Sequence, residues 1–160
     1  MDDAIARGAK SPSLREDTIG QALAEAARRW PDQEAVVSVH QAIRWTWRDL
    51  DGHSTAMAAG LLALGLEPGD RIGIWSPNKA QWSLTQFAAA RAGLILVTIN
   101  PAYRLSEVEY TLNKVGVKAL VAAESFKTSL YADMIDSLAP RSPPANPARS
   151  SRPAFHNLKL

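Results

Sequence analysis

Residues 100–110, NPAYRLSEVEY, hold the densest group of side chains that could do chemistry. Tyr103, Arg104 and Glu107 could form an acid/base cluster, since phenols and carboxylates both serve as proton-transfer groups. The same letters contain Asn-Pro-Ala-Tyr, the NPxY pattern that phosphotyrosine-binding adaptor domains bind in tail peptides. A third interpretation is architectural, with the stretch forming only the bend between a strand and a helix.

The architectural interpretation accounts for most of these residues. Proline cannot donate to a strand ladder and biases the preceding residue toward extended backbone, so Asn100-Pro101 is expected to end a strand. Ser106 and Glu109 have the spacing of a capping box, which predicts a helix start there. Leu105 and Tyr110 lie at the positions of the matching hydrophobic staple. An adaptor signal would need a disordered segment, and an acid/base pair would need a partner or a phosphate loop.

Few other residues can be assigned to chemistry. The chain has no cysteine, which excludes disulfides, thiolate nucleophiles and cysteine-based zinc sites. The three histidines, at positions 40, 53 and 156, lack ligand spacing, and His53 is expected on the buried side of a helix as a structural residue. No G-x-S-x-G elbow, Walker loop or G-x-G-x-x-G fingerprint occurs. We therefore assign no catalytic, cofactor-binding or metal-binding residue from the sequence.

Composition and charge describe one globular domain with a basic end. The 160 residues are 46% apolar and 21% charged, enough for a single domain with a core. The net charge of +2 is uneven, because the last twenty residues hold four basic residues and no acid. Residues 1–140 carry a net charge of −2, so the basic isoelectric point reports the tail. Nucleic acid is therefore not expected as a partner.

Hydrophobic periodicity and turn residues predict alternating elements from residue 18 onward. We expect helices over 18–30, 48–65, 79–92, 106–116 and 127–139, and strands over 34–39, 42–47, 71–75, 94–99 and 118–122. Thr18 and Gln21 should form a capping box, Asn78 should cap the third helix, and Leu130 should face inward on the last. The fold class is therefore α/β, a parallel βαβαβα unit preceded by a helix, a β-hairpin and a helix.

The later strands also locate an expected ligand edge. Their unbroken apolar runs indicate a parallel sheet that is covered on both faces. Ligands of such sheets bind at the carboxyl ends of the strands. Those ends are Ser76-Pro77-Asn78, Asn100-Pro101 and Ala122-Ala123-Glu124.

The two ends of the chain differ from its centre. Residues 1–17 are expected to form a flexible N-terminus, and residues 141–160, rich in Pro, Ser and Arg, a disordered tail. Asp2 and Asp3 argue against a signal peptide or a mitochondrial presequence. No apolar run is long enough to span a bilayer, so we expect a cytoplasmic protein without a transmembrane segment.

The ordered set of motifs resembles the AMP-forming adenylating enzymes, in particular the fatty acyl-CoA synthetases. WTWRDLDGHSTAMAAGLLALGLEPGDRIGIWSPNKAQW is similar to the family's first conserved region, and FAAARAGLILVTINPAYRLSEVEYTLNKVGVKALV to its second. The likeness covers roughly residues 18–138. The residues that carry it are Trp45, Thr46, Leu50, Gly69, Asp70, Arg71, Pro77, Asn78, Gly93, Asn100, Pro101, Tyr103 and Glu107.

The resemblance implies a two-step ligation. A medium- or long-chain fatty acid attacks the α-phosphate of ATP, which gives an acyl-adenylate and pyrophosphate, and the thiol of coenzyme A then displaces AMP. Mg²⁺ offsets the charge of the triphosphate. The family's phosphate loop and later catalytic motifs have no match in these 160 residues. Residues 18–140 therefore resemble a truncated N-terminal subdomain of an AMP-binding enzyme, expected to bind none of these cofactors and to be inactive alone.

The missing remainder of such a domain suggests two further expectations. A sheet without its neighbouring strands exposes apolar surface, through which the chain should self-associate. The alternative function is a non-catalytic binding or regulatory module that uses the NPAY segment or the exposed sheet. Whether the chain is itself an enzyme stays open at this point.

Overall fold

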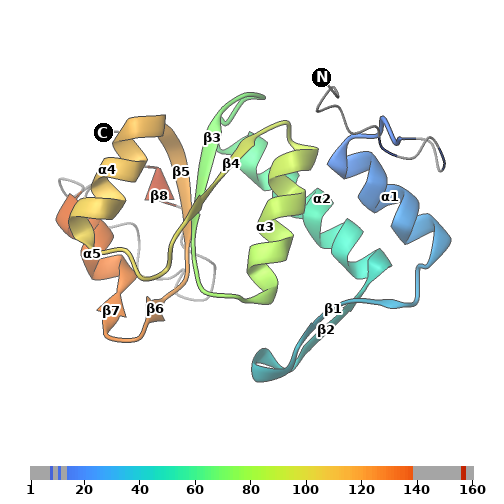
Figure 1. Ribbon diagram of the computed structural model, residues 1–160, viewed down its shortest axis with the longest axis horizontal. Helices are drawn as coiled ribbons and strands as arrows, with labels where there is room; N and C mark the ends of the chain where they lie inside the picture. Colours follow the sequence, from blue (N-terminus) through green and yellow to red (C-terminus); the bar gives the residue numbers. More distant parts are fainter. Residues whose placement is uncertain (1–7, 9–10, 12–13, 139–155, 158–160) are drawn as a thin grey trace, which may run out of the picture.

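A computed structural model describes residues 8, 11, 14–138 and 156–157 as an α/β fold (Figure 1). The helices are α1 (Ile19–Arg29), α2 (Trp47–Ala63), α3 (Ala80–Arg91), α4 (Leu105–Val115) and α5 (Tyr131–Leu138). The strands are β1 (Glu34–Ser38), β2 (Ile43–Thr46), β3 (Arg71–Trp75), β4 (Ile95–Ile99), β5 (Val117–Ala122), β6 (Ser125–Phe126), β7 (Ser129–Leu130) and β8 (His156–Asn157), with a short 3-10 helix (η1, Val39–Gln41). This order confirms the predicted helix, hairpin and helix ahead of a βαβαβα unit.

The main sheet has the strand order β4-β3-β5-β8. Strand β3 runs parallel to both β4 and β5, with Gly73 opposite Val97 on one side and Leu120 on the other. The described pair His156–Asn157 adds an antiparallel strand beside β5. Most of the expected flexible N-terminus (1–17) and the expected tail (141–160) lies outside the described residues.

Two core clusters cover the two faces of the sheet. Helices α2 and α3 lie on one side of the strands and α4 and α5 on the other (Figure 1). The first cluster is rich in small residues, which lets α3 approach the sheet closely: Ala58, Leu61, Leu66, Ile72, Ala88, Ala89, Ala92, Leu94 and Ala119. The second cluster is larger in its side chains: Trp75, Ile99, Val108, Leu112, Val117, Leu120, Tyr131 and Ile135. Burial on both faces confirms this prediction for β3, whereas β4 is only partly covered, with Ile95 and Thr98 exposed.

The parallel strands begin at one edge of the sheet, here called the amino edge. Two turns that contain glycine fix the chain at this edge. The amide of Gly69 donates to the carbonyl of Gly93 at 2.8 Å, and both residues have positive φ, +90° and +70°. A side chain at Gly93 would also lie 3.1 Å from the ring of Pro68. Glycine is needed at both positions because other residues rarely adopt this backbone conformation. The turn therefore fixes where β3 and β4 start.

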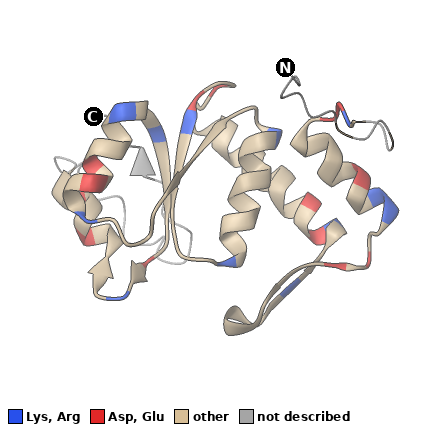
Figure 2. Ribbon diagram, in the orientation of Figure 1, with Lys and Arg blue, Asp and Glu red and all other residues tan. Residues whose placement is uncertain are grey.

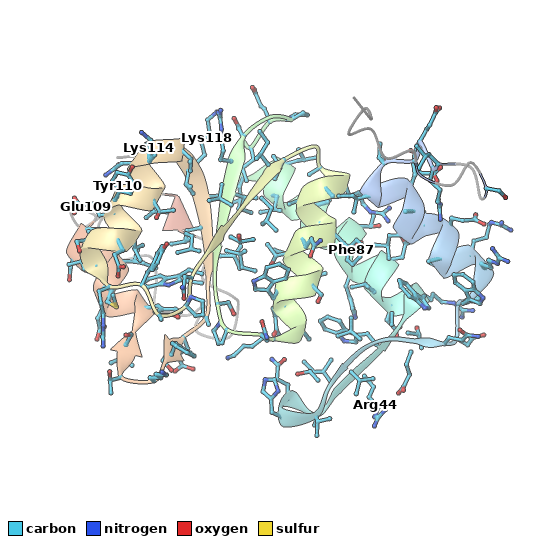
Figure 3. The ribbon with its side chains drawn as sticks, in the orientation of Figure 1. Arg44, Phe87, Glu109, Tyr110, Lys114 and Lys118 are labelled. Atoms are coloured by element: carbon cyan, nitrogen blue, oxygen red, sulfur yellow. The ribbon has the colours of Figure 1, made fainter. Side chains whose placement is uncertain are left out.

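Asp70 closes the same turn with its side chain. Its carboxylate accepts the Glu67 amide at 2.9 Å and pairs with the Lys118 ammonium at 2.5 Å. The Lys118 ammonium and the Glu67 amide hold the pKa of the Asp70 carboxyl below its ordinary value. Asp70 thus ties the start of β3 to β5, and Figure 3 shows Lys118 at this edge.

Hydrogen bonds between residues close in sequence cap the starts of α1 and α2. The predicted box of Thr18 and Gln21 is confirmed, with bonds of 2.8 and 3.2 Å between each backbone amide and the other side chain. Thr46 forms an equivalent box with Asp49 ahead of α2. Bonds from the amide and hydroxyl of Thr46 lower the pKa of the Asp49 carboxyl. The sequence motif around Thr46 is thus a helix start.

His53 does not lie on the buried side of α2, and that prediction is wrong. Its ring is exposed and packs edge-on against Trp45 of β2, with centroids 5.0 Å apart. The buried stripe of the helix consists of Leu50, Ser54, Ala58 and Leu61. His53 precedes Ser54 by one position, which turns it about 100° away from that stripe.

Asn78 does not cap α3, which also corrects a prediction. The helix begins one residue later than expected, with Lys79 at the cap position and no side-chain cap from it. Gln41 of the hairpin tip accepts the Ala80 amide at 2.8 Å instead, and its own amide donates to Gln81 at 2.8 Å. Ser38 donates to the same Gln41 oxygen at 2.8 Å. The first backbone amide of α3 therefore finds its hydrogen-bond acceptor in a side chain from a distant part of the sequence.

The last helix is shorter than predicted. Residues 125–130 form the small β6–β7 hairpin, and α5 starts only at Tyr131. Leu130 is therefore 56% exposed and does not face inward as expected, whereas Ile135 is buried. Tyr131, the first residue of the helix, is buried in the second core cluster.

Charged side chains of both signs occur along the described part of the chain. Figure 2 shows Lys and Arg interspersed with Asp and Glu over the elements, without a face of one sign. No helix in the described ranges combines the length and the apolar character needed to cross a membrane.

Replacing Gln41 with Ala should lower the free energy of unfolding by about 1 kcal/mol, as for loss of a helix cap. The buried Ala80 amide would lose its only side-chain acceptor among the described contacts. Urea unfolding measures the change. Gln81→Ala is the matched control, since it removes only the exposed bond between the two side chains. Equal stability of the two variants would contradict the capping role.

Replacing Asp70 with Asn should change the pH dependence of stability. Because the folded pKa is depressed, the carboxylate stabilises the fold fully above its unfolded pKa of about 3.9 and loses this contribution as pH falls through the lower folded pKa. The difference in unfolding free energy between the parent and Asp70→Asn should therefore shrink below about pH 4. Lys118→Met should remove part of the same dependence. A difference that stays constant from neutral to acid pH would refute the assignment.

Candidate functional site

The carboxyl ends of β3 and β4 open onto a cleft of about 500 Å³, here called the carboxyl-edge cleft. These strand ends lie at the lower edge of the sheet in Figure 1. Its lining consists of Ser76, Pro77, Asn78, Trp82, Thr98, Ile99, Asn100, Pro101, Tyr103 and Phe126. Two of the three strand ends expected at a ligand site, those after β3 and β4, thus meet in one concavity.

The Asn100–Pro101 corner of this cleft is held by the Asn100 side chain and by side chains from β3 and α5. The Asn100 carbonyl accepts the Tyr103 amide at 3.0 Å and the Trp75 indole N–H at 3.1 Å. The Asn100 side chain accepts the Ala102 amide at 2.9 Å, which tightens the turn. The Pro101 carbonyl accepts the Tyr131 hydroxyl at 2.6 Å. The corner is therefore a fixed bend whose polar backbone is satisfied.

Trp75 and Tyr131 form the support beneath the corner. Their rings stack with centroids 3.8 Å apart and planes 15° apart, and both side chains are fully buried. Burial raises the pKa of the Tyr131 phenol, so at neutral pH the hydroxyl keeps its proton and acts as a donor. One stacked pair thus supplies donors to two consecutive carbonyls of the cleft wall.

The cap position of helix α4 lies two residues before the predicted one. The Glu107 carboxylate accepts the Arg104 amide at 2.8 Å, so the cap position is Arg104, whose own side chain makes no cap bond, and the predicted capping box of Ser106 and Glu109 is wrong. Tyr103, which packs against the second core cluster, and Val108, which belongs to it, then take the staple positions. Burial of these two side chains outweighs the local Ser-x-x-Glu pattern.

The predicted staple residues are correspondingly on the surface. Leu105 is 37% exposed and Tyr110 65% exposed. Figure 3 shows Tyr110 and Glu109 on the outer side of α4. Leu105 and Tyr110 therefore do not form a hydrophobic staple at the start of α4.

Tyr103, Arg104 and Glu107 have separate partners. Tyr103 packs against the second core cluster, and the Arg104 guanidinium donates to the Ser129 hydroxyl at 3.0 Å. Glu107 is occupied by the Arg104 backbone. These contacts give each side chain a structural role, so the geometry does not support an acid/base cluster.

The cleft is electrically neutral. Its lining holds hydroxyl and amide groups beside aromatic rings and prolines, and none of its residues is acidic or basic. An adjoining groove of about 320 Å³ between the hairpin and α3 adds His40 and Lys79. Within the described ranges no three His, Asp or Glu side chains gather as a metal site. Such a surface can bind apolar groups and hydrogen-bond neutral ones, and its lining holds no carboxylate or imidazole for proton transfer.

The residues of the family resemblance fall into three places. Trp45, Thr46 and Leu50 join the hairpin to α2, and Gly69, Asp70, Arg71 and Gly93 lie at the amino edge of the sheet. Pro77, Asn78, Asn100, Pro101 and Tyr103 line the cleft, and Glu107 holds the start of α4 just behind it. The structure therefore brings five of them together at the candidate site.

Sequence reasoning missed four aromatic residues of the site: Trp75, Trp82, Phe126 and Tyr131. Trp75 was recognised only as the last residue of a strand. Phe126 lies four residues beyond the end of β5. Its closeness to a strand end could have identified it as a residue of the site. No local pattern identifies Tyr131, since its role depends on contact with Trp75 across the fold.

Replacing Tyr131 with Phe should lower the free energy of unfolding by about 1 kcal/mol, because the ring stack stays while the buried Pro101 carbonyl loses a donor. Chemical denaturation measures the difference. Tyr110→Phe is the matched control and should change stability by less than about 0.5 kcal/mol, since it alters an exposed side chain. If the two variants unfold alike, the hydroxyl does not hold the corner.

Comparison with known proteins agrees with this architecture. The model of the AMP-binding enzyme family matches residues 23–155. The zebrafish (Danio rerio) protein named medium-chain acyl-CoA ligase ACSF2, mitochondrial, is 45% identical over 154 residues, which cover 94% of this chain and 25% of that protein. The human protein of the same name is 43% identical over 141 residues, covering 88% of this chain and 23% of that one. The chain thus spans about a quarter of the length of these relatives.

A solved structure shares the fold. The N-terminal domain of FACL13 from Mycobacterium tuberculosis superimposes with a TM-score of 0.71 at 26% identity, covering 80% of this chain and 31% of that one. The match rests on the same mixed α/β arrangement around a parallel sheet. The chain belongs to the AMP-binding enzyme family.

Proposed function

We propose that this chain is the N-terminal part of an AMP-forming acyl-CoA ligase, in which it supplies one wall of the substrate site and no catalytic group. The supporting observation is the carboxyl-edge cleft, whose wall is fixed by the Trp75 and Tyr131 bonds to the Asn100–Pro101 corner. A fixed, neutral wall orients a substrate by contact rather than by reacting with it.

The substrate class we propose is a medium- or long-chain fatty acid. Relatives that match this chain are named medium-chain acyl-CoA ligases. The ring and proline surfaces of Trp82, Phe126 and Pro101 in the cleft suit an aliphatic chain better than a polar one. The neutral hydroxyl and amide groups of Ser76 and Asn78 could orient its polar end.

The residues of the cleft do not fit the triphosphate of ATP with Mg²⁺. Binding of a triphosphate calls for cations or clustered backbone amides, and binding of Mg²⁺ for carboxylates. The cleft lining has no charged side chain. We therefore assign ATP, Mg²⁺ and coenzyme A to the parts of the full-length relatives that this chain does not span, and we propose that the chain alone is inactive.

The alternative of a non-catalytic binding module stays a prediction. Its NPAY version needs Tyr103 in a free, extended segment. The bonds at Asn100 and Pro101 and the packing of Tyr103 on the second core cluster count against that version. The expected cytoplasmic location also stays a prediction, and cell fractionation against a mitochondrial marker would test it.

A chimaera tests the proposed function. The matching stretch of the zebrafish ligase would be replaced by residues 14–138, and fatty-acid-dependent exchange of pyrophosphate into ATP would be measured. We expect activity within about tenfold of the parent enzyme, because the wall would present the same fixed cleft. The parent lacking this stretch is the control and should be inactive. A folded chimaera without exchange activity would disprove the proposal.

A second experiment tests the isolated 160-residue chain. We expect it to show no fatty-acid-dependent exchange above the blank, since it supplies no group for phosphate chemistry. Robust exchange by the purified chain would overturn the assignment of catalysis to other parts of the protein.

A further inference from the structure

Strand β4 is the terminal strand of the described sheet on one side, with β3 as its only described neighbour. Its sequence Ile95–Ile99 contains no charged residue and no proline, and Figure 2 draws the strand without a charged position. Ile95 is 50% exposed. Natural edge strands are usually protected by a charge, a proline or a bulge, and β4 has none of these.

The backbone of β4 has a defined outward pattern. The Ile95 amide donates to the Asp70 carbonyl at 2.8 Å, so the backbone groups of Ile95 face β3. Backbone direction alternates along a strand, which turns Val97 and Ile99 toward β3 as well. The amides and carbonyls of Leu96 and Thr98 therefore point away from the sheet, toward the open edge.

We propose that this edge binds a second copy of the chain through antiparallel β4–β4 pairing about a two-fold axis at Val97. In this register Leu96 lies opposite Thr98 of the second copy, and each such pair exchanges both of its backbone hydrogen bonds. Val97 lies opposite Val97 of the second copy in a non-hydrogen-bonded position. The two three-stranded parallel units then join into one continuous sheet, and β4 itself brings no charge to the contact.

The neighbouring registers are blocked by bonds that already exist. A two-fold axis at Leu96 would require the Leu94 amide, which donates to the Ala89 carbonyl at 2.8 Å. An axis at Thr98 would require the Asn100 carbonyl, which accepts from Tyr103 and from the Trp75 indole. The register centred on Val97 uses only backbone groups that face the open edge.

The association is weak and reversible. A five-residue strand pair buries much less than the roughly 1,200 Å² of a standard stable interface. Dimers therefore form only at high protein concentration. This inference locates the self-association expected from the sequence, and it does not depend on the ligase function proposed above.

Single cysteines test the register, because the chain has no cysteine of its own. Val97→Cys places two thiols opposite each other across the two-fold axis, at a Cα separation of about 4.5 Å that a disulfide can span. Thr98→Cys is the control: Thr98 is more exposed than Val97, yet it faces Leu96 of the second copy. Under mild oxidation of the full chain, the disulfide dimer of Val97→Cys should form about tenfold faster. Faster cross-linking of Thr98→Cys would indicate random collision of exposed thiols and would overturn the proposal.

A charge on the edge gives an independent readout. Thr98→Lys should raise the dimer dissociation constant in analytical ultracentrifugation by at least about tenfold, since an edge lysine blocks strand addition. Thr55→Lys makes the same substitution on the exposed face of α2 and should leave association unchanged. Equal dissociation constants for the two variants, or a parent chain that stays monomeric at every concentration, would refute the proposal. Circular dichroism confirms that each variant is folded, and if one cysteine variant unfolds, the lysine pair decides.

Discussion

The stacked rings of Trp75 and Tyr131 are the contact on which the carboxyl edge of the sheet depends. Trp75 ends β3, Tyr131 begins α5, and their donors reach the two carbonyls that follow β4. The Ala123 amide, just after β5, also donates to the Trp75 carbonyl at 3.0 Å. Three strand ends are thus tied to one buried pair, and the corner can hold its shape because its support lies in the core rather than in solvent.

The two edges of the sheet are stabilised in different ways. At the amino edge the strands must start in register, and glycine conformations at Gly69 and Gly93, together with the Asp70–Lys118 pair, set those starts. At the carboxyl edge the chain must turn out of the sheet, and the turn must keep a fixed shape. The Asn100–Pro101 corner meets this demand through side-chain donors from below. A division between a structural edge and a ligand edge is typical of parallel α/β sheets.

Local chemistry predicted much of this fold, and its failures share one cause. The box at Thr18 and the strand end at Pro101 depend on neighbours in the sequence, and both are found. The starts of α3, α4 and α5 were misplaced because burial or a distant partner decided them: Gln41 for α3, Tyr103 and Val108 for α4, and Tyr131 for α5. The strand-end rule predicted where the cleft lies, whereas the aromatic residues behind it required knowledge of which rings meet.

The cap that Gln41 provides for α3 also has a consequence for the order of folding. The bond spans 39 positions, so the first turn of the helix is completed only after a long loop has closed. The hairpin lies earlier in the chain and leaves the ribosome first, so the acceptor is available when Ala80 emerges. Measurement of a φ-value at Gln41 would show whether this contact forms before or after the main barrier. Because the cap of α3 comes from the hairpin, the first turn of this helix can form fully only when the hairpin has docked.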